Sequence, residues 1–247
     1  MFSFRYRFYP KSEDAKGFFD YALSWYLSAL SSNGQLLGEW NLAHTGGALE
    51  LACIAPEEDS LYPKYHSIPA SEAYDKVLAR SGRKPMFELS GPEAILSGTC
   101  KCTDSSSLIL FTTCIHTEPP VICADCGLHV PLYKLPKYKD DADYTSILDW
   151  VAACKACDEL FLQSGSMERF GWKQLAEHDS DLTNRGTDIC KDLSAKLGKP
   201  FYYAVRSRPD KRVRNCPSCK AIWEIKDQGL SSFNLKCEAC GLVSIGS

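Results

Sequence analysis

The sequence predicts an α+β protein with a ferredoxin-like sandwich at its N-terminus, a helical middle section and a C-terminal zinc ribbon. Three observations predict this order. Strand and helix patterns alternate over residues 1–117, helical periodicity dominates residues 118–205, and two cysteine pairs flank a hairpin pattern in residues 206–247. The chain has 247 residues, enough for more than one compact unit, so we take these three segments as the predicted domains.

The first segment begins with a period-two pattern. Phe2, Phe4, Tyr6 and Phe8 alternate with polar or basic residues, which is typical of a strand with one buried face. The elements expected after it are a helix from Ser12 to Asn33-Gly34, strands over 36–43 and 48–55, a helix over 69–79, and strands over 86–89 and 108–115. The resulting order, β-α-β-β-α-β-β, fits a ferredoxin-like sandwich.

Apolar residues at helical spacing dominate the middle segment. They predict one helix over residues 144–163 and another that ends at Gly198 and Pro200, because glycine and proline are typical helix stop signals. Residues 201–205 then predict a short strand.

The C-terminal segment carries the strongest motif. Cys216-x-x-Cys219 and Cys237-x-x-Cys240 have the spacing of a zinc ribbon, in which each pair forms a turn that points two sulfurs at one ion. About thirty residues cannot bury enough apolar area to fold alone, so metal binding, on the order of 10 kcal/mol, is expected to offset the ordering entropy. Four cysteines close the coordination shell, which predicts a structural Zn²⁺ with no place for a catalytic water.

A second zinc site is an open alternative. Cys123 and Cys126, followed by Gly127, form another knuckle, and Cys154 and Cys157 are its candidate partners by CxxC spacing. Those two lie inside a predicted helix, where they serve equally well as small core residues.

Other cysteines leave further alternatives. Cys114 or Cys190 can replace one ligand of the second site. Cys100 and Cys102, or Cys114 with His116, also carry metal-binding groups, but neither pair has a complete set of partners. We interpret these as core or loop residues.

Catalytic and membrane signatures are absent from the sequence. HExxH, GxSxG, Gly-rich phosphate loops and the zinc-deaminase pattern do not occur, so we expect no enzyme. No apolar stretch approaches the roughly 18 residues of a membrane span, and the N-terminus lacks the apolar region of a signal peptide. We therefore expect a cytoplasmic protein, in which paired cysteines indicate metal binding before disulfides.

The charge distribution suggests two classes of partner. The formal net charge is -3, and residues 206–247 form the one segment of the three that is net positive. A protein with a basic surface would meet acidic clusters at Asp140, Asp141, Asp143, Glu177, Asp179 and Asp181. Nucleic acid, the alternative, would be attracted by Arg206, Arg208, Lys211, Arg212 and Arg214.

Several runs carry a resemblance to a known family. They are Cys123–Pro136 (CADCGLHVPLYKLP), Trp150 with Ala156-Cys157-Asp158, Gly186 with Ile189-Cys190, Pro200–Tyr203 and Cys240–Ser244. Over about residues 118–247 the chain resembles a bacterial family of zinc-ribbon proteins, a domain of unknown function to which nucleic-acid binding has been ascribed. Family members also look like immunity proteins encoded beside secreted nuclease toxins. The resemblance therefore implies a non-catalytic inhibitor that covers the basic active site of such a toxin, with a nucleic-acid-binding protein as the alternative.

Overall fold

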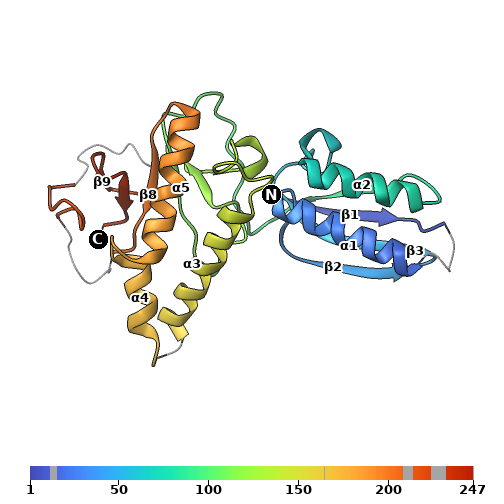
Figure 1. Cartoon of the computed structure of the whole chain (residues 1–247), viewed down its shortest axis with the longest axis horizontal. Helices are drawn as coiled ribbons and strands as arrows, with labels where there is room; N and C mark the ends of the chain where they lie inside the picture. The colour runs from blue at the N-terminus through green and yellow to red at the C-terminus, as the bar shows by residue number, and fades with distance from the viewer. Residues whose placement is uncertain (12–15, 164, 208–213, 224–231, 247) are drawn as a thin grey trace. The chain divides into compact units, whose positions relative to one another are not determined.

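The structure, a computed structural model, describes residues 1–11, 16–163, 165–207, 214–223 and 232–246 (Figure 1). The chain forms two compact units. Unit 1 comprises Met1–Thr99, Thr117–Pro119 and Pro131–Thr145, and unit 2 comprises Cys100–His116, Pro120–Val130 and Ser146–Ser247. The predicted helix start at Ser12 lies outside the described residues, as do three residues of the basic run, Arg208, Lys211 and Arg212.

Unit 1 has the predicted ferredoxin-like topology. Its elements are β1 (Phe2–Phe8), α1 (Lys16–Ser32), β2 (Leu37–Thr45), β3 (Ala48–Ala55), α2 (Ile68–Arg80) and β4 (Met86–Pro92), drawn blue to teal in Figure 1. The four strands form one sheet in the order β2-β3-β1-β4, and every neighbouring pair is antiparallel. The period-two pattern of β1 places Phe4, Tyr6 and Phe8 in one core with the apolar faces of α1 and α2.

Half-buried His66 makes unit 1 sensitive to acid. Its Nε2 lies 3.2 Å from the Tyr26 hydroxyl, its ring packs on Tyr26 and Tyr74, and its Nδ1 is buried without a hydrogen-bond partner. Burial lowers the pKa of His66 from 6.5 to about 4. Because the unfolded chain binds a proton between these two values and the folded chain does not, this contribution to stability is complete above about pH 6.5.

We expect the contribution to be lost as the pH falls from 6.5 toward 4. Allowing for the partial solvent exposure of the ring, the loss is about 2 kcal/mol. Urea unfolding at pH 7 and pH 4.5 should therefore show a smaller pH dependence in His66→Gln than in the parent chain. Exposed His44 provides the control, because His44→Gln should leave the pH dependence unchanged. An unchanged pH dependence in His66→Gln would contradict the assignment.

Unit 2 is built on a sheet in the order β7-β6-β5-β8-β10-β9. Its strands are β5 (Leu108–Leu110), β6 (Val121–Cys123), β7 (His129–Val130), β8 (Phe201–Ala204), β9 (Leu235–Cys237) and β10 (Leu242–Ser244). Its helices are α3 (Thr145–Gln163), α4 (Glu168–Ala176) and α5 (Asp181–Leu197). Two short 3-10 helices, Pro63–Tyr65 and Leu132–Lys134, belong to unit 1. No helix among the described residues is long and apolar enough to cross a membrane.

This sheet corrects one predicted strand and contains one predicted boundary. The strand predicted over 108–115 does not complete the sandwich, since β5 pairs with β6 and β8 in unit 2 and all three of its residues are buried. The predicted boundary between 118–205 and 206–247 falls between strands of this one sheet. β10 of the ribbon pairs in parallel with β8 of the middle section, so the two segments share one sheet.

Gly186 allows α5 to pack closely on β8. A Cβ at this position would lie 2.0 Å from Tyr203 Cε2 and 2.9 Å from Trp150 Nε1, which in turn donates to Leu182 O at 3.2 Å. Both aromatic side chains are almost fully buried and have no room to move.

We therefore expect Gly186→Ala to lower the free energy of unfolding of unit 2 by about 1–3 kcal/mol through overpacking. The matched control is Gly17→Ala in α1, where a Cβ meets no atom within 4 Å. That change should be neutral or slightly stabilising because alanine favours the helix. Urea unfolding measures both, and equal behaviour of the two variants would contradict the packing argument.

Candidate metal centres

Two groups of four cysteines bring their sulfur atoms together in unit 2. Site 1 consists of Cys100, Cys102, Cys123 and Cys126, and site 2 consists of Cys216, Cys219, Cys237 and Cys240. Within each site the four sulfurs lie within 4.8 Å of one another. Site 2 is the set predicted from the ribbon spacing, whereas site 1 combines one predicted knuckle with two cysteines that were expected to be core or loop residues.

The knuckles of the two sites share one backbone pattern. In site 1, Gly127 N–H donates to Cys123 O at 2.9 Å, and Cys123 N–H donates to Leu128 O at 2.9 Å. Site 2 repeats these bonds at the matching positions, with Lys220 N–H to Cys216 O at 3.0 Å and Cys216 N–H to Ala221 O at 2.8 Å. Such a turn holds the two sulfurs of a CxxC pair on one side of the backbone.

The residue after each knuckle adopts the left-handed conformation. Its φ is +71° at Gly127, +65° at Lys220 and +64° at Gly241. Glycine adopts this conformation without a steric penalty, which explains two of the three positions. Lys220 adopts this conformation despite the steric cost to a residue with a Cβ. Its carbonyl accepts a hydrogen bond from Asn215 Nδ2 at 2.6 Å.

In site 2 the thiols differ in their readiness to ionise. The backbone N–H of Ala221 and the neighbouring sulfurs lower the pKa of Cys219 to about 7. Burial raises the pKa of Cys237 to about 12, although its sulfur lies only 3.5 Å from that of Cys219. Four sulfurs this close need a cation to exist together as thiolates, the form that binds metal.

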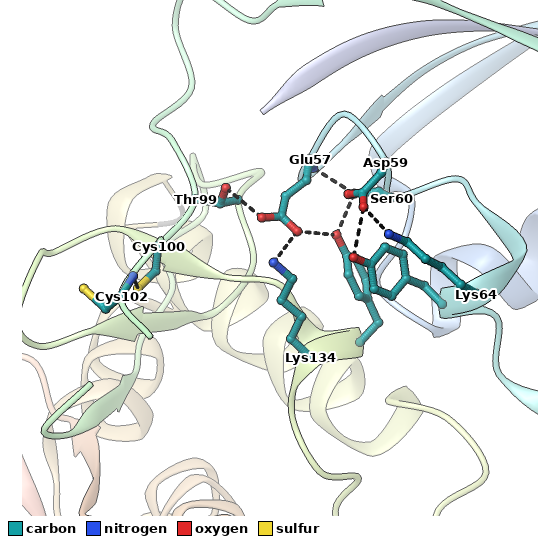
Figure 2. A network of polar contacts seen from close by, with 10 residues as sticks. Glu57, Asp59, Ser60, Lys64, Thr99, Cys100, Cys102 and Lys134 are labelled. Atoms are coloured by element: carbon teal, nitrogen blue, oxygen red, sulfur yellow. Dashed lines mark hydrogen bonds and ion pairs between the residues drawn. The ribbon is translucent and has the colours of Figure 1, made fainter. Parts of the chain in front are cut away.

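Site 1 joins the end of β6 to the loop that carries Cys100 and Cys102. Cys100 N–H donates to His129 O at 2.8 Å, and Ala124 N–H donates to Ser107 O at 3.1 Å, so both ends of the loop are bonded to the β6–β7 hairpin. Cys102 N–H donates to Cys100 Sγ at 3.4 Å (Figure 2). Burial raises the pKa of Cys100, whereas the N–H of Leu128 and the neighbouring sulfurs lower that of Cys126 against the opposing effect of burial.

The predicted partners Cys154 and Cys157 are not ligands of site 1. Both are buried in α3, where Cys154 Sγ lies 3.9 Å from Thr112 O and burial raises its pKa to about 12. α4 packs closely against the backbone of α3 at Cys157, because a Cβ on Gly171 would lie 2.4 Å from Cys157 O. Their i, i+3 spacing on a helix therefore reflects core packing, and the predicted set Cys123, Cys126, Cys154 and Cys157 is corrected to site 1.

The alternative ligands have other surroundings. Cys190 is fully buried in α5, and burial raises its pKa well above the usual value. Cys114 N–H donates to Asp158 Oδ2 at 2.8 Å. Neither belongs to a four-cysteine group in the described part of the chain.

The chemistry of both sites is that of closed sulfur shells. Four cysteine sulfurs suit tetrahedral Zn²⁺, and such sets also accept iron. Because the protein fills every position, a metal held here has no open coordination site for a water or a substrate. Both sites can therefore bind metal ions such as zinc and hold chain segments together.

Unit 1 contains a separate buried polar network centred on Glu57 (Figure 2). Its carboxylate pairs with Lys134 Nζ at 2.5 Å and accepts from the Tyr133 hydroxyl at 3.1 Å and from Thr99 Oγ1 at 3.3 Å. Ser60 Oγ lies 2.6 Å from the Tyr133 hydroxyl and accepts from Glu57 N–H at 2.7 Å. The network fixes residues 131–134 to the sandwich of unit 1, which indicates a structural role.

Three of the six predicted acidic contact residues lie at helix ends. Asp143 Oδ1 accepts from Thr145 N–H at 2.9 Å where α3 begins, and Asp181 occupies the first turn of α5. Glu177 ends α4 and lies 3.9 Å from Lys173 Nζ. Asp140 and Asp179 are exposed, and Asp141 is half-buried. A contact between these residues and a partner remains a prediction.

Arg206 of the predicted basic run is engaged within unit 2. Its Nη2 lies 3.0 Å from Asp158 Oδ2, a carboxylate that is 7% exposed, and its guanidinium lies 5.3 Å from the ring centroid of Phe111. Arg214 is exposed.

Comparison with known proteins assigns no function. Residues 1–91, 102–205 and 206–247 match three families, each described as a domain of unknown function (DUF8589, DUF2310 and DUF8594). Two relatives from Haemophilus influenzae are both named "Uncharacterized protein". One is 28% identical over 86% of this chain and 85% of its own length, and the other is 26% identical over 77% and 92%.

Four solved structures similar to this chain each cover 37–39% of it. Rv0793 from Mycobacterium tuberculosis is 19% identical, with a TM-score of 0.32, over 37% of this chain and 96% of that one. A structure titled "Putative antibiotic biosynthesis monooxygenase from Nitrosomonas europaea" is 9% identical, with a TM-score of 0.31, over 37% and 98%. Likeness at this level supports no statement about activity.

Proposed function

We propose that the protein is a non-catalytic binding protein whose unit 2 is held together by two structural Zn²⁺ ions. The observation that carries this proposal is the closed set of four cysteines at each site, which leaves a metal no open position for chemistry. The two sites also lie at opposite ends of the sheet order, since β6 ends at Cys123 and edge strand β9 ends at Cys237. Zinc would therefore fix both margins of one sheet.

The partner we propose is a protein with a basic surface, of the kind found in nuclease toxins. Four thiolates and one Zn²⁺ carry a charge of -2, so two loaded sites would lower the formal net charge from -3 to about -7. A negative surface speeds association with a basic cleft and can occlude a nucleic-acid path. The protein would then act as an inhibitor or immunity protein.

Co-expression with a nuclease toxin encoded beside this chain tests the partner. We expect a stable complex that co-purifies, an inactive nuclease, and an association rate that falls steeply with added salt. Absence of both a complex and protection from the toxin would contradict the proposal.

Nucleic-acid binding is the alternative function, and it can be tested on the same purified protein. It predicts affinity for generic DNA or RNA that falls with a steep salt slope. The ion pair between Arg206 and Asp158 argues against it, because Arg206 already has an intramolecular partner. Detectable affinity at about 0.1 M salt, in the absence of any protein complex, would replace the proposal with this alternative.

A further inference from the structure

Helices α1 and α2 of unit 1 border a groove with a volume of about 1090 Å³. α1 lines it with Tyr21 and Trp25 and with small residues such as Ser24 and Ser28, and α2 lines it with Lys76 and Arg80. None of the described residues that line the groove is acidic. It is unrelated to the cysteine sites, which lie in unit 2.

Each wall of the groove is a pair of residues spaced four apart on a helix. Tyr21 and Trp25 therefore share one face of α1, and Lys76 and Arg80 share one face of α2. The walls meet where Lys76 Nζ lies 3.7 Å from the ring centroid of Trp25. Arg80 Nη1 donates to Lys76 O at 3.2 Å, which holds the guanidinium against the last turn of α2.

Tyr21 is unusually exposed for a large aromatic side chain. Its side chain is 75% exposed, whereas Leu23, Tyr26 and Leu27 of the same helix are fully buried in the core. A large ring left in water beside an indole and two cations forms a surface on which a flat ring can stack while an anion pairs with the cations. Arginine and lysine are the usual side chains for a phosphate group.

We propose that this groove binds a nucleoside monophosphate, with the base stacked on the exposed ring of Tyr21 and the phosphate held by Lys76 and Arg80. The volume slightly exceeds the roughly 300–1,000 Å³ typical of small-molecule sites, so a nucleotide fits within it. This activity goes beyond the proposed partner binding and requires neither zinc nor a protein partner.

Titration of the full, metal-loaded chain with AMP, followed by NMR and calorimetry, tests the proposal. We expect saturable binding with a 1:1 stoichiometry. Adenosine and inorganic phosphate should each bind at least tenfold more weakly than AMP, because each lacks one of the two recognised groups. Absence of saturation by AMP at 10 mM, or equal binding of AMP and inorganic phosphate, would overturn the proposal, as would binding of oligo(dT) without binding of AMP.

Variants of the groove side chains separate recognition from folding, since Tyr21 and Lys76 are exposed and Arg80 is half-buried. Tyr21→Ala, Lys76→Gln and Arg80→Gln should each weaken AMP binding at least fivefold with unchanged unfolding midpoints. Lys84→Gln and Tyr62→Ala, exposed residues of unit 1 outside the groove lining, are the matched controls and should stay within twofold. Equal losses in the control variants would show that the binding is not in this groove.

Discussion

Cys237→Ser is expected to lower the metal content from two ions to one per chain and to destabilise unit 2 by at least about 4 kcal/mol, since structural zinc contributes on the order of 10 kcal/mol in small modules. Cys237 lies where β9 meets its knuckle, so losing the metal also frees the edge of the sheet. Cys100→Ser should remove the other ion by the same reasoning. Inductively coupled plasma mass spectrometry and urea unfolding measure the two quantities.

Cys154→Ala is the matched control for both variants. It removes a buried thiol of α3 that lies outside both sites, so it should cost about 1–2 kcal/mol and leave two ions bound. Loss of an ion in Cys154→Ala, with retention of two ions in Cys100→Ser, would restore the ligand set predicted from the sequence and contradict site 1.

Glu57→Ala is expected to lower the free energy of unfolding of unit 1 by about 2–3 kcal/mol, because it removes a buried carboxylate that accepts several hydrogen bonds, while the partly exposed Lys134 can turn to solvent. The change leaves the Lys134 ammonium and the hydroxyls of Tyr133 and Thr99 without their carboxylate. Unit 2 should keep both metal ions, because Glu57 belongs to neither site.

Glu58→Ala supplies the control for that measurement, since Glu58 is the next residue and is exposed. It should change the unfolding free energy by less than about 0.5 kcal/mol. A cost below about 1 kcal/mol for Glu57→Ala would contradict the structural role of the network.

The fold of unit 1 could be predicted because its signals are local. Alternation in β1 and the apolar faces of α1 and α2 depend only on neighbouring residues, and short connections limit the topology to a few choices. The placement of residues 108–110 could not be predicted in the same way. Three apolar residues in a row fit the centre of any sheet, and only their pairing with β6 and β8 decides which one.

The two metal sites also differ in whether local sequence patterns or long-range contacts define them. Site 2 was predictable because both of its halves are CxxC knuckles, a pattern fixed by a single turn. Site 1 was only half predictable, since Cys100 and Cys102 have no knuckle spacing and reach Cys123 through long-range bonds such as Ala124 N–H to Ser107 O. Cys154 and Cys157 were wrongly predicted to be metal ligands because their i, i+3 spacing also suits one buried face of a helix.

The incomplete pairs contained the signal that was missed. Cys100 and Cys102 lacked two partners, and so did the knuckle at Cys123 and Cys126. Combining two half-sets gives one tetrahedral shell and leaves the cysteines of α3 for the core, where the structure places them.

Native mass spectrometry of the folded chain can show whether two metal ions hold unit 2 together, because it counts the metal ions in each intact molecule. We expect the main species to carry two zinc ions, and we expect chelation of both to give a broader, more highly charged distribution, because unit 2 unfolds while unit 1 keeps its own core. A compact species that retains its narrow charge distribution with no metal bound would contradict this expectation.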